Sequence, residues 1–158
     1  MKPWRRTLLA AAAFALWPRA GSAVQSDDGD DQALLADADY MAGLAALKTG
    51  DAATALPRFQ SVLKRFPQAA NLHNELGYTY RKLRRFDKAF EHYKRALAID
   101  PRHRGAHEYI GEAYLMVGDV GNAEKHLAAL RSICLLPCDE LRDLQKAIAE
   151  HRAQPGPR

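Results

Sequence analysis

The residues best suited to chemistry in this chain are its two cysteines, Cys134 and Cys138. A close, even pair of cysteines in an exported chain is most simply a disulfide, and the N-terminus described below indicates export. Pro137 disfavours helix at Leu136, so the intervening residues should form a loop that can bring the two sulfur atoms together. We therefore predict a short structural disulfide.

A metal site is the competing interpretation of the same thiols. Two thiolates supply half of a tetrahedral site, but His126 lies eight residues before Cys134, about 12 Å away along a helix. Thiol exchange has less support, because Cys-x-x-x-Cys lacks the two-residue spacing of thioredoxin-like centres. We predict no bound metal and no cofactor, and a periplasmic metal- or thiol-handling role stays open as the alternative.

No catalytic group of residues stands out elsewhere. The sequence contains no glycine-rich phosphate loop, no nucleophile elbow and no His-Glu-x-x-His. We therefore expect that the chain is not an enzyme.

The sequence repeats itself every 34 residues. Residues 73–80 (HNELGYTY) and 107–114 (HEYIGEAY) are two versions of one segment. A fixed period of this length predicts a stacked helix-turn-helix array, in which no unit can bury its apolar face alone. The residues expected to pack the repeats together are Gly43, Ala55, Phe59, Gly77, Tyr80, Ala89, Tyr93, Gly111, Tyr114 and Ala123, with Leu127 in the third aromatic place.

This pattern resembles the tetratricopeptide repeat, in which small residues, aromatics and a closing proline recur in this order. Pro67 and Pro101 take the closing place, whereas Asp39, His73 and His107 stand where the family often has Trp. The resemblance implies an all-α fold, a right-handed α-solenoid of three helix-turn-helix repeats at 36–69, 70–103 and 104–137. It also implies a scaffold that binds a protein or peptide.

A further helix is expected after the cysteines, at about 138–152. Leu141, Leu144 and Ile148 would lie on one face of it and cover the exposed apolar side of the last repeat. With the two cysteines, this capping helix is similar to the C-terminal segment of short exported bacterial repeat proteins.

The first 23 residues are typical of a secretory signal peptide. Three basic residues precede an apolar run of about 11 residues, too short to cross a bilayer, and small residues follow. We expect cleavage after Ala23, by the general secretory or the twin-arginine route, and a periplasmic or secreted protein without a transmembrane segment.

The net charge of +4 comes entirely from that segment, because residues 24–158 carry 19 basic and 19 acidic side chains. The basic pI therefore gives no reason to expect nucleic-acid binding. Residues 24–35 are acidic and should form a flexible leader, either solvated or folded over the basic middle repeat, and residues 153–158 should be a disordered tail.

The first helix of each pair should line the concave wall of the solenoid. Because Leu72, Leu76 and Tyr80 would be buried, the helical period places the polar residues between them on the groove side. Amide, phenol and charged groups there suit a peptide, although the Lys and Asn arrangement with which some relatives hold a chaperone's terminal carboxylate is missing. The expected partner-binding residues are Tyr40, Asn71, Asn74, Tyr78, Arg81, Lys82, Glu108 and Glu112.

The basic run from Arg81 to Arg85 falls in the turn of the middle repeat. It is either a solvated turn or a contact to an anionic envelope surface, and the second makes an envelope-surface binding module another alternative. The sequence thus predicts an exported scaffold for cell-envelope protein assembly. Self-association through an uncapped face stays open.

Overall fold

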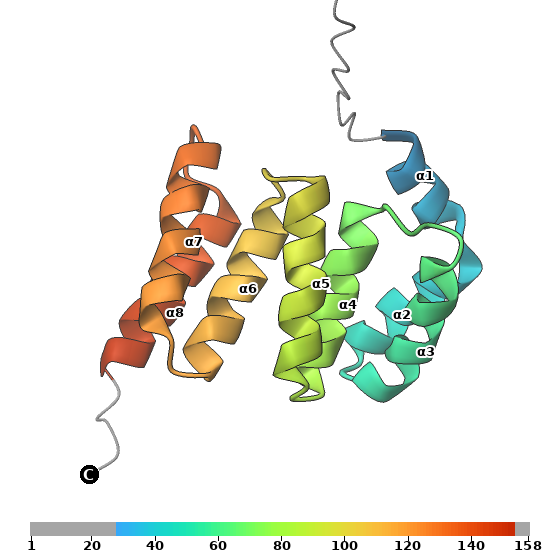
Figure 1. Cartoon of the computed structure of the whole chain (residues 1–158), viewed down its shortest axis with the longest axis horizontal. Helices are drawn as coiled ribbons and strands as arrows, with labels where there is room; N and C mark the ends of the chain where they lie inside the picture. The colour runs from blue at the N-terminus through green and yellow to red at the C-terminus, as the bar shows by residue number, and fades with distance from the viewer. Residues whose placement is uncertain (1–27, 154–158) are drawn as a thin grey trace, which may run out of the picture.

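The computed structural model describes residues 28–153. The predicted signal peptide, residues 24–27 and residues 154–158 lie outside this range. Within it the chain forms helices only, which stack as successive pairs in chain order, and the last helix packs beside the final pair (Figure 1). The helices are α1 (Asp28–Ala36), α2 (Ala38–Lys48), α3 (Ala52–Leu63), α4 (Ala70–Lys82), α5 (Phe86–Ile99), α6 (Arg104–Met116), α7 (Val120–Ile133) and α8 (Asp139–Ala153).

The helices pair as the 34-residue period requires. Each of the ranges 36–69, 70–103 and 104–137 holds one helix pair, and the second helices α3, α5 and α7 begin 34 residues apart. The predicted fold class, an all-α solenoid of helix-turn-helix repeats with a C-terminal helix, is confirmed. No helix of residues 28–153 is long and apolar enough to cross a membrane.

A glycine in the first helix of each of the first two repeats lets an aromatic ring approach closely. A Cβ added to Gly43 would lie 2.5 Å from Cε1 of Phe59, and one added to Gly77 would lie 2.5 Å from Cδ1 of Tyr93. Both rings are fully buried, as are Ala55, Ala89 and Ala123 in the second helices of the three repeats. The two helices of the first and second repeats are therefore held close by a contact that no larger residue allows.

The third repeat makes the corresponding contact differently. Gly111 faces Leu144 of α8, where an added Cβ would lie 2.7 Å from the Leu144 Cδ2 atom. Leu127, which we expected in this place, is buried in the apolar cluster that joins α7 to α8. Because leucine is shorter than the aromatic side chains of the earlier repeats, the capping helix supplies the group that covers Gly111.

Part of the acidic leader is helical. Residues 28–35, which we expected to be flexible, belong to α1, which packs against α2. Leu34 is buried in the same cluster as Tyr40 and Phe59, and burying this leucine offsets the low helix propensity of the neighbouring acids. At the other end, α8 includes Ala153, which we expected in the tail.

The turns between the two helices of each repeat differ in the residue that takes the left-handed backbone conformation. Gly50 and Gly118 have φ angles of 82°, and Arg84, at the corresponding position of the middle repeat, has a φ of 62°. This left-handed conformation suits glycine and costs other residues about 1 kcal/mol.

The next residue in each turn differs in the same way. Asp51 and Asp119 cap the following helices by accepting hydrogen bonds from the backbone of Thr54 and Asn122, whereas Arg85 makes no such cap. A missing cap costs about 1 kcal/mol. The middle turn is therefore less stable than the other two at both Arg84 and Arg85.

Candidate functional site

A hollow of about 490 Å³ lies between the first helices of the second and third repeats. Helices α4 and α6 pack against each other directly. Side chains one helical turn apart on each helix, together with the α4–α5 turn, form the walls. The lining residues are Tyr78, Arg81, Lys82, Arg84, Tyr109, Glu112 and Met116.

Two tyrosines form the apolar part of this hollow. The ring centroids of Tyr78 and Tyr109 are 5.1 Å apart with their planes tilted by 48°. Both side chains are half-buried, so their faces remain accessible. Such a pair can hold an apolar or aromatic side chain of a partner at little cost in conformational entropy.

Arg81 fixes this arrangement from beneath. Its guanidinium lies 5.1 Å from the ring centroid of Tyr78 and 5.4 Å from that of Tyr109, and it donates a hydrogen bond to Glu112. Burial alone would lower the pKa of Arg81, but Tyr93 and Glu112 outweigh it and raise the pKa. Arg81 is only 7% exposed, so it positions the rings and Glu112 more than it offers a charge to a partner.

Polar groups under the hollow are only partly satisfied. The Nε atom of Arg81 and the hydroxyl oxygen of Tyr93 are buried, and neither has a hydrogen-bond partner. Leaving a buried polar group unpaired costs about 1–3 kcal/mol. The floor of the hollow is thus a strained polar region.

Two carboxyl groups near the hollow have raised pKa values. Burial raises the pKa of Glu75 to about 7. Burial, and then repulsion from Glu112, Asp143 and Glu140, raises the pKa of Glu108 to about 7. The net charge of the residues around the hollow therefore changes around neutral pH.

The structure brings together four of the eight residues predicted to bind a partner, namely Tyr78, Arg81, Lys82 and Glu112. Asn71 is close by but its amide oxygen is 3.0 Å from Nε2 of His103, which ties α4 to the start of α6. Glu108 is half-buried beside the hollow and does not line it.

Tyr40 and Asn74 do not belong to a groove surface, and this part of the prediction is wrong. Both are 5% exposed, and Tyr40 packs with its ring centroid 5.8 Å from that of Phe59. Tyr40, Asn74 and Glu108 share one repeat position. In the second repeat the Asn74 amide faces the next repeat near Gly105. This position lies between successive units, which the helical period of a single unit does not show.

Sequence reasoning missed Tyr109 and Met116, and it named Arg84 only as part of the basic turn, not of the groove. Tyr109 and Met116 lie three residues before and four residues after Glu112, so the helical spacing around that predicted residue was a usable signal. The position of Arg84 depends on the turn conformation, which the sequence pattern did not indicate.

The hollow continues toward the capping helix. A second hollow of about 270 Å³ shares Arg81, Glu112 and Met116 with the first and extends to α8, where Glu150 and His151 line it. The groove thus crosses the second repeat, the third repeat and the cap.

Two histidine pairs join the helices of the second and third repeats. The Nδ1 atoms of His73 and His92 are 3.0 Å apart, and those of His107 and His126 are 2.9 Å apart. In the first pair, Nε2 of His73 lies 3.1 Å from the Pro67 carbonyl oxygen. Since a carbonyl only accepts, His73 donates there, and its Nδ1 accepts from His92.

Both outer histidines are kept neutral by this environment. Burial, and then the facing histidine, lowers the pKa of His92 and that of His126 to about 4. Each ring also stacks on a tyrosine, His92 on Tyr80 and His126 on Tyr114. The 34-residue spacing of both members was the signal that could have predicted these pairs.

The two cysteines are joined by a disulfide, and their Cα atoms are 6.0 Å apart. Leu135 and Leu136 project from the loop between them and are 95% and 80% exposed. Among residues 28–153 no group of three or more His, Cys, Asp or Glu side chains could hold a metal ion.

The fold and the groove define a helical repeat scaffold, and comparisons with known proteins agree. Residues 40–103 match the tetratricopeptide repeat family. No curated protein matches the sequence. Among solved structures, the TPR2B domain of yeast Sti1 in its pHsp70 complex is similar over 74% of this chain and 95% of that chain, with a TM-score of 0.67 and 19% identity.

A second similar structure is MamA of AMB-1, with a TM-score of 0.55 and 24% identity over 72% of this chain and 64% of that chain. At these identities the structures support the fold alone. The resemblance seen in the sequence is confirmed over residues 40–103, which match the tetratricopeptide repeat family, and the solved structures support the same fold for the chain.

Proposed function

We propose that this chain is an exported scaffold that binds a protein or peptide partner in the groove between α4 and α6, in the assembly of cell-envelope proteins. The observation that carries the proposal is the Tyr78–Tyr109 pair, which lines an open hollow with charged groups around it. Tetratricopeptide folds are protein-binding scaffolds, and the complexed Sti1 domain has the same fold. The export part rests on the N-terminal sequence.

The mechanism is preorganisation. Arg81 and Glu112 hold the two tyrosines before a partner arrives, so little side-chain freedom is lost on binding. An apolar side chain of the partner would pack on the exposed part of the ring pair, while its backbone or polar groups meet the charged rim.

Site-specific photo-crosslinking in living cells tests the groove. A photoreactive phenylalanine analogue in place of Tyr78 should capture a partner, and the same analogue in place of Lys94, exposed on α5 outside the hollow, should not. With the purified partner, Tyr78→Ala together with Tyr109→Ala should weaken binding at least about 10-fold. Equal capture at both positions would show that the groove is not the binding surface.

Export is tested separately by sequencing the N-terminus of the protein recovered from its host. A chain that begins at Val24 and is found outside the cytoplasm supports the proposal. An intact Met1 on a cytoplasmic protein contradicts the export part and leaves the groove untouched.

A further inference from the structure

The turn between α4 and α5 differs from the other two turns at two adjacent positions, and both differences introduce a basic residue. Arg84 takes the left-handed position held by Gly50 and Gly118, and Arg85 takes the capping position held by Asp51 and Asp119. Both changes destabilise the turn, and a positive charge at the start of α5 also opposes the helix dipole. Each change adds a cation where the flanking repeats have none.

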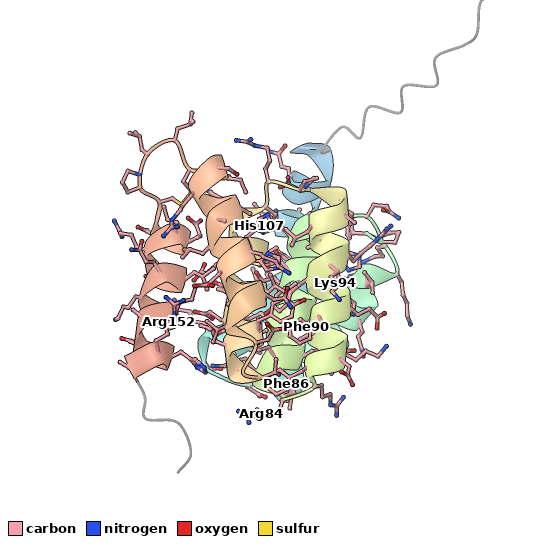
Figure 2. The ribbon with its side chains drawn as sticks, turned by 60° about the vertical axis from the view of Figure 1, so that its left-hand side comes forward. Arg84, Phe86, Phe90, Lys94, His107 and Arg152 are labelled. Atoms are coloured by element: carbon pink, nitrogen blue, oxygen red, sulfur yellow. A yellow bond between two sulfur atoms is a disulfide. The ribbon has the colours of Figure 1, made fainter. Side chains whose placement is uncertain are left out.

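These cations are not used to hold the fold together. Among residues 28–153, neither Lys82 nor Arg84 forms an ion pair, whereas Arg81 is paired with Glu112. In Figure 2, Arg84 and Phe86 lie together at the lower end of the molecule, and the Arg84 guanidinium is 5.3 Å from the Phe86 ring centroid. Lys82 lies in the same way 5.6 Å from the ring centroid of Tyr78.

Both free cations line the same hollow as the tyrosine pair. Glu112 is the acidic side chain of that lining, and Arg81 neutralises it. The lining therefore keeps two uncompensated positive charges, with Lys82 over the ring of Tyr78 and Arg84 over that of Phe86. This arrangement complements an anion next to an apolar group.

We propose that Lys82 and Arg84 form a subsite for the acidic side chain of a bound peptide, whose neighbouring apolar side chain packs on the exposed part of the Tyr78–Tyr109 pair. This inference rests on the proposed function and names the partner chemistry of the same groove. A peptide fits better than a membrane surface, because the cations converge on a hollow with an aromatic wall. The strained conformation of Arg84 is then the structural cost of placing a guanidinium at this rim.

Selection from a random peptide library displayed on phage tests the subsite, with the full-length chain as bait. Displayed peptides have no free C-terminus, so any acid that is selected is an internal side chain. We expect enriched sequences to contain Asp or Glu beside Leu, Phe or Met, and a synthetic peptide of the enriched sequence to lose affinity as salt is added.

Two variants at one position separate binding from stability. Arg84→Gln removes the charge and keeps a side chain in the left-handed conformation, so the peptide should bind about tenfold more weakly with no change in the melting temperature. Arg84→Gly should weaken binding equally while raising the melting temperature by about 3 °C. Arg85→Ala, outside the hollow, serves as the control and should bind the peptide as the original chain does.

Four outcomes would overturn the inference. Enriched peptides that are basic or neutral, or acidic peptides that bind Arg84→Gln unchanged, contradict the subsite and leave the groove proposal standing. If no peptide is enriched, both the proposed function and the subsite are contradicted. Binding to phosphatidylglycerol vesicles that is lost in Arg84→Gln, with peptide binding unaffected, assigns the turn to a membrane surface instead.

Discussion

The first repeat and the two later repeats make the same helix-to-helix contact with different chemistry. Asp39 and Arg58 of the first repeat occupy the positions of His73 and His92 in the second, and their side chains form an ion pair at 2.9 Å. Arg58 is 52% exposed and Asp39 31% exposed, whereas the residue His73 is 6% exposed. In the first repeat, water stabilises the exposed charges of the ion pair. In the two later repeats, the contact is more buried and is made by neutral imidazoles.

The glycine–aromatic contact is common to the first and second repeats and should show the largest effect. Gly77→Ala and Gly43→Ala should each destabilise the protein by about 3 kcal/mol, because the added Cβ meets a ring at 2.5 Å in both. Gly105→Ala, where the nearest atom would be at 3.6 Å, is the control and should be neutral or stabilising. Urea unfolding measures all three, and a neutral Gly43→Ala would show that the first repeat packs differently.

Acid should distinguish the two kinds of contact. The pKa values of His92 and His126 are lowered to about 4, so the stability they contribute is present above pH 6.5 and is lost as the pH falls toward 4. Allowing for partial exposure, we expect a loss of about 2 kcal/mol between about pH 7.5 and about pH 4.5. His92→Gln with His126→Gln should remove this loss, because glutamine can donate to the facing histidine and does not titrate.

The carboxyls of Glu75 and Glu108 act with the opposite sign in the same experiment. Their pKa values are raised to about 7, so their contribution is present at low pH and is lost as the pH rises through about 7. Subtracting the stability of the double glutamine variant from that of the original chain at each pH leaves the contribution of the histidines, because both proteins keep the two carboxyls. Parallel stability curves for the two proteins would contradict a role for these pairs in acid sensitivity.

Removing the charge pair of the first repeat should have the smallest effect. Arg58→Ala should cost less than about 1 kcal/mol, because the pair is exposed and Asp39 also lies 3.4 Å from Arg65. Thermal melts in low and high salt measure this, and the small loss should vanish in high salt. A loss as large as that of the glycine variants would mean that the charge pair, not packing, holds the first repeat.

The fold was predictable because one physical requirement acts at every 34th residue. The sequence indicates close helix packing through two repeated glycine–aromatic pairs, Gly43 with Phe59 and Gly77 with Tyr93. The helix boundaries follow the same 34-residue spacing. The exception is α1, where a single buried leucine, Leu34, orders an acidic segment that composition alone describes as flexible.

The groove was predictable only in part, because its shape depends on contacts between repeats. The period of one helix correctly places Tyr78 and Lys82 on its face, but it cannot show that Asn74 faces the next unit. The turn conformation of Arg84 is likewise set by its neighbours in space. The histidine pairs join positions 19 residues apart, which become neighbours only when two helices lie side by side.

The contact between Leu144 and Gly111 determines where the array can change in length. A duplicated unit of residues 70–103 inserted before residue 104 would keep the present neighbours on its two outer sides, and the junction between the copies would place Tyr78 where Glu112 now pairs with Arg81. A unit added after residue 137 would instead have to displace α8 from the glycine that it covers. Duplication within the gene could therefore lengthen the protein from its middle, while the C-terminal helix marks a fixed end.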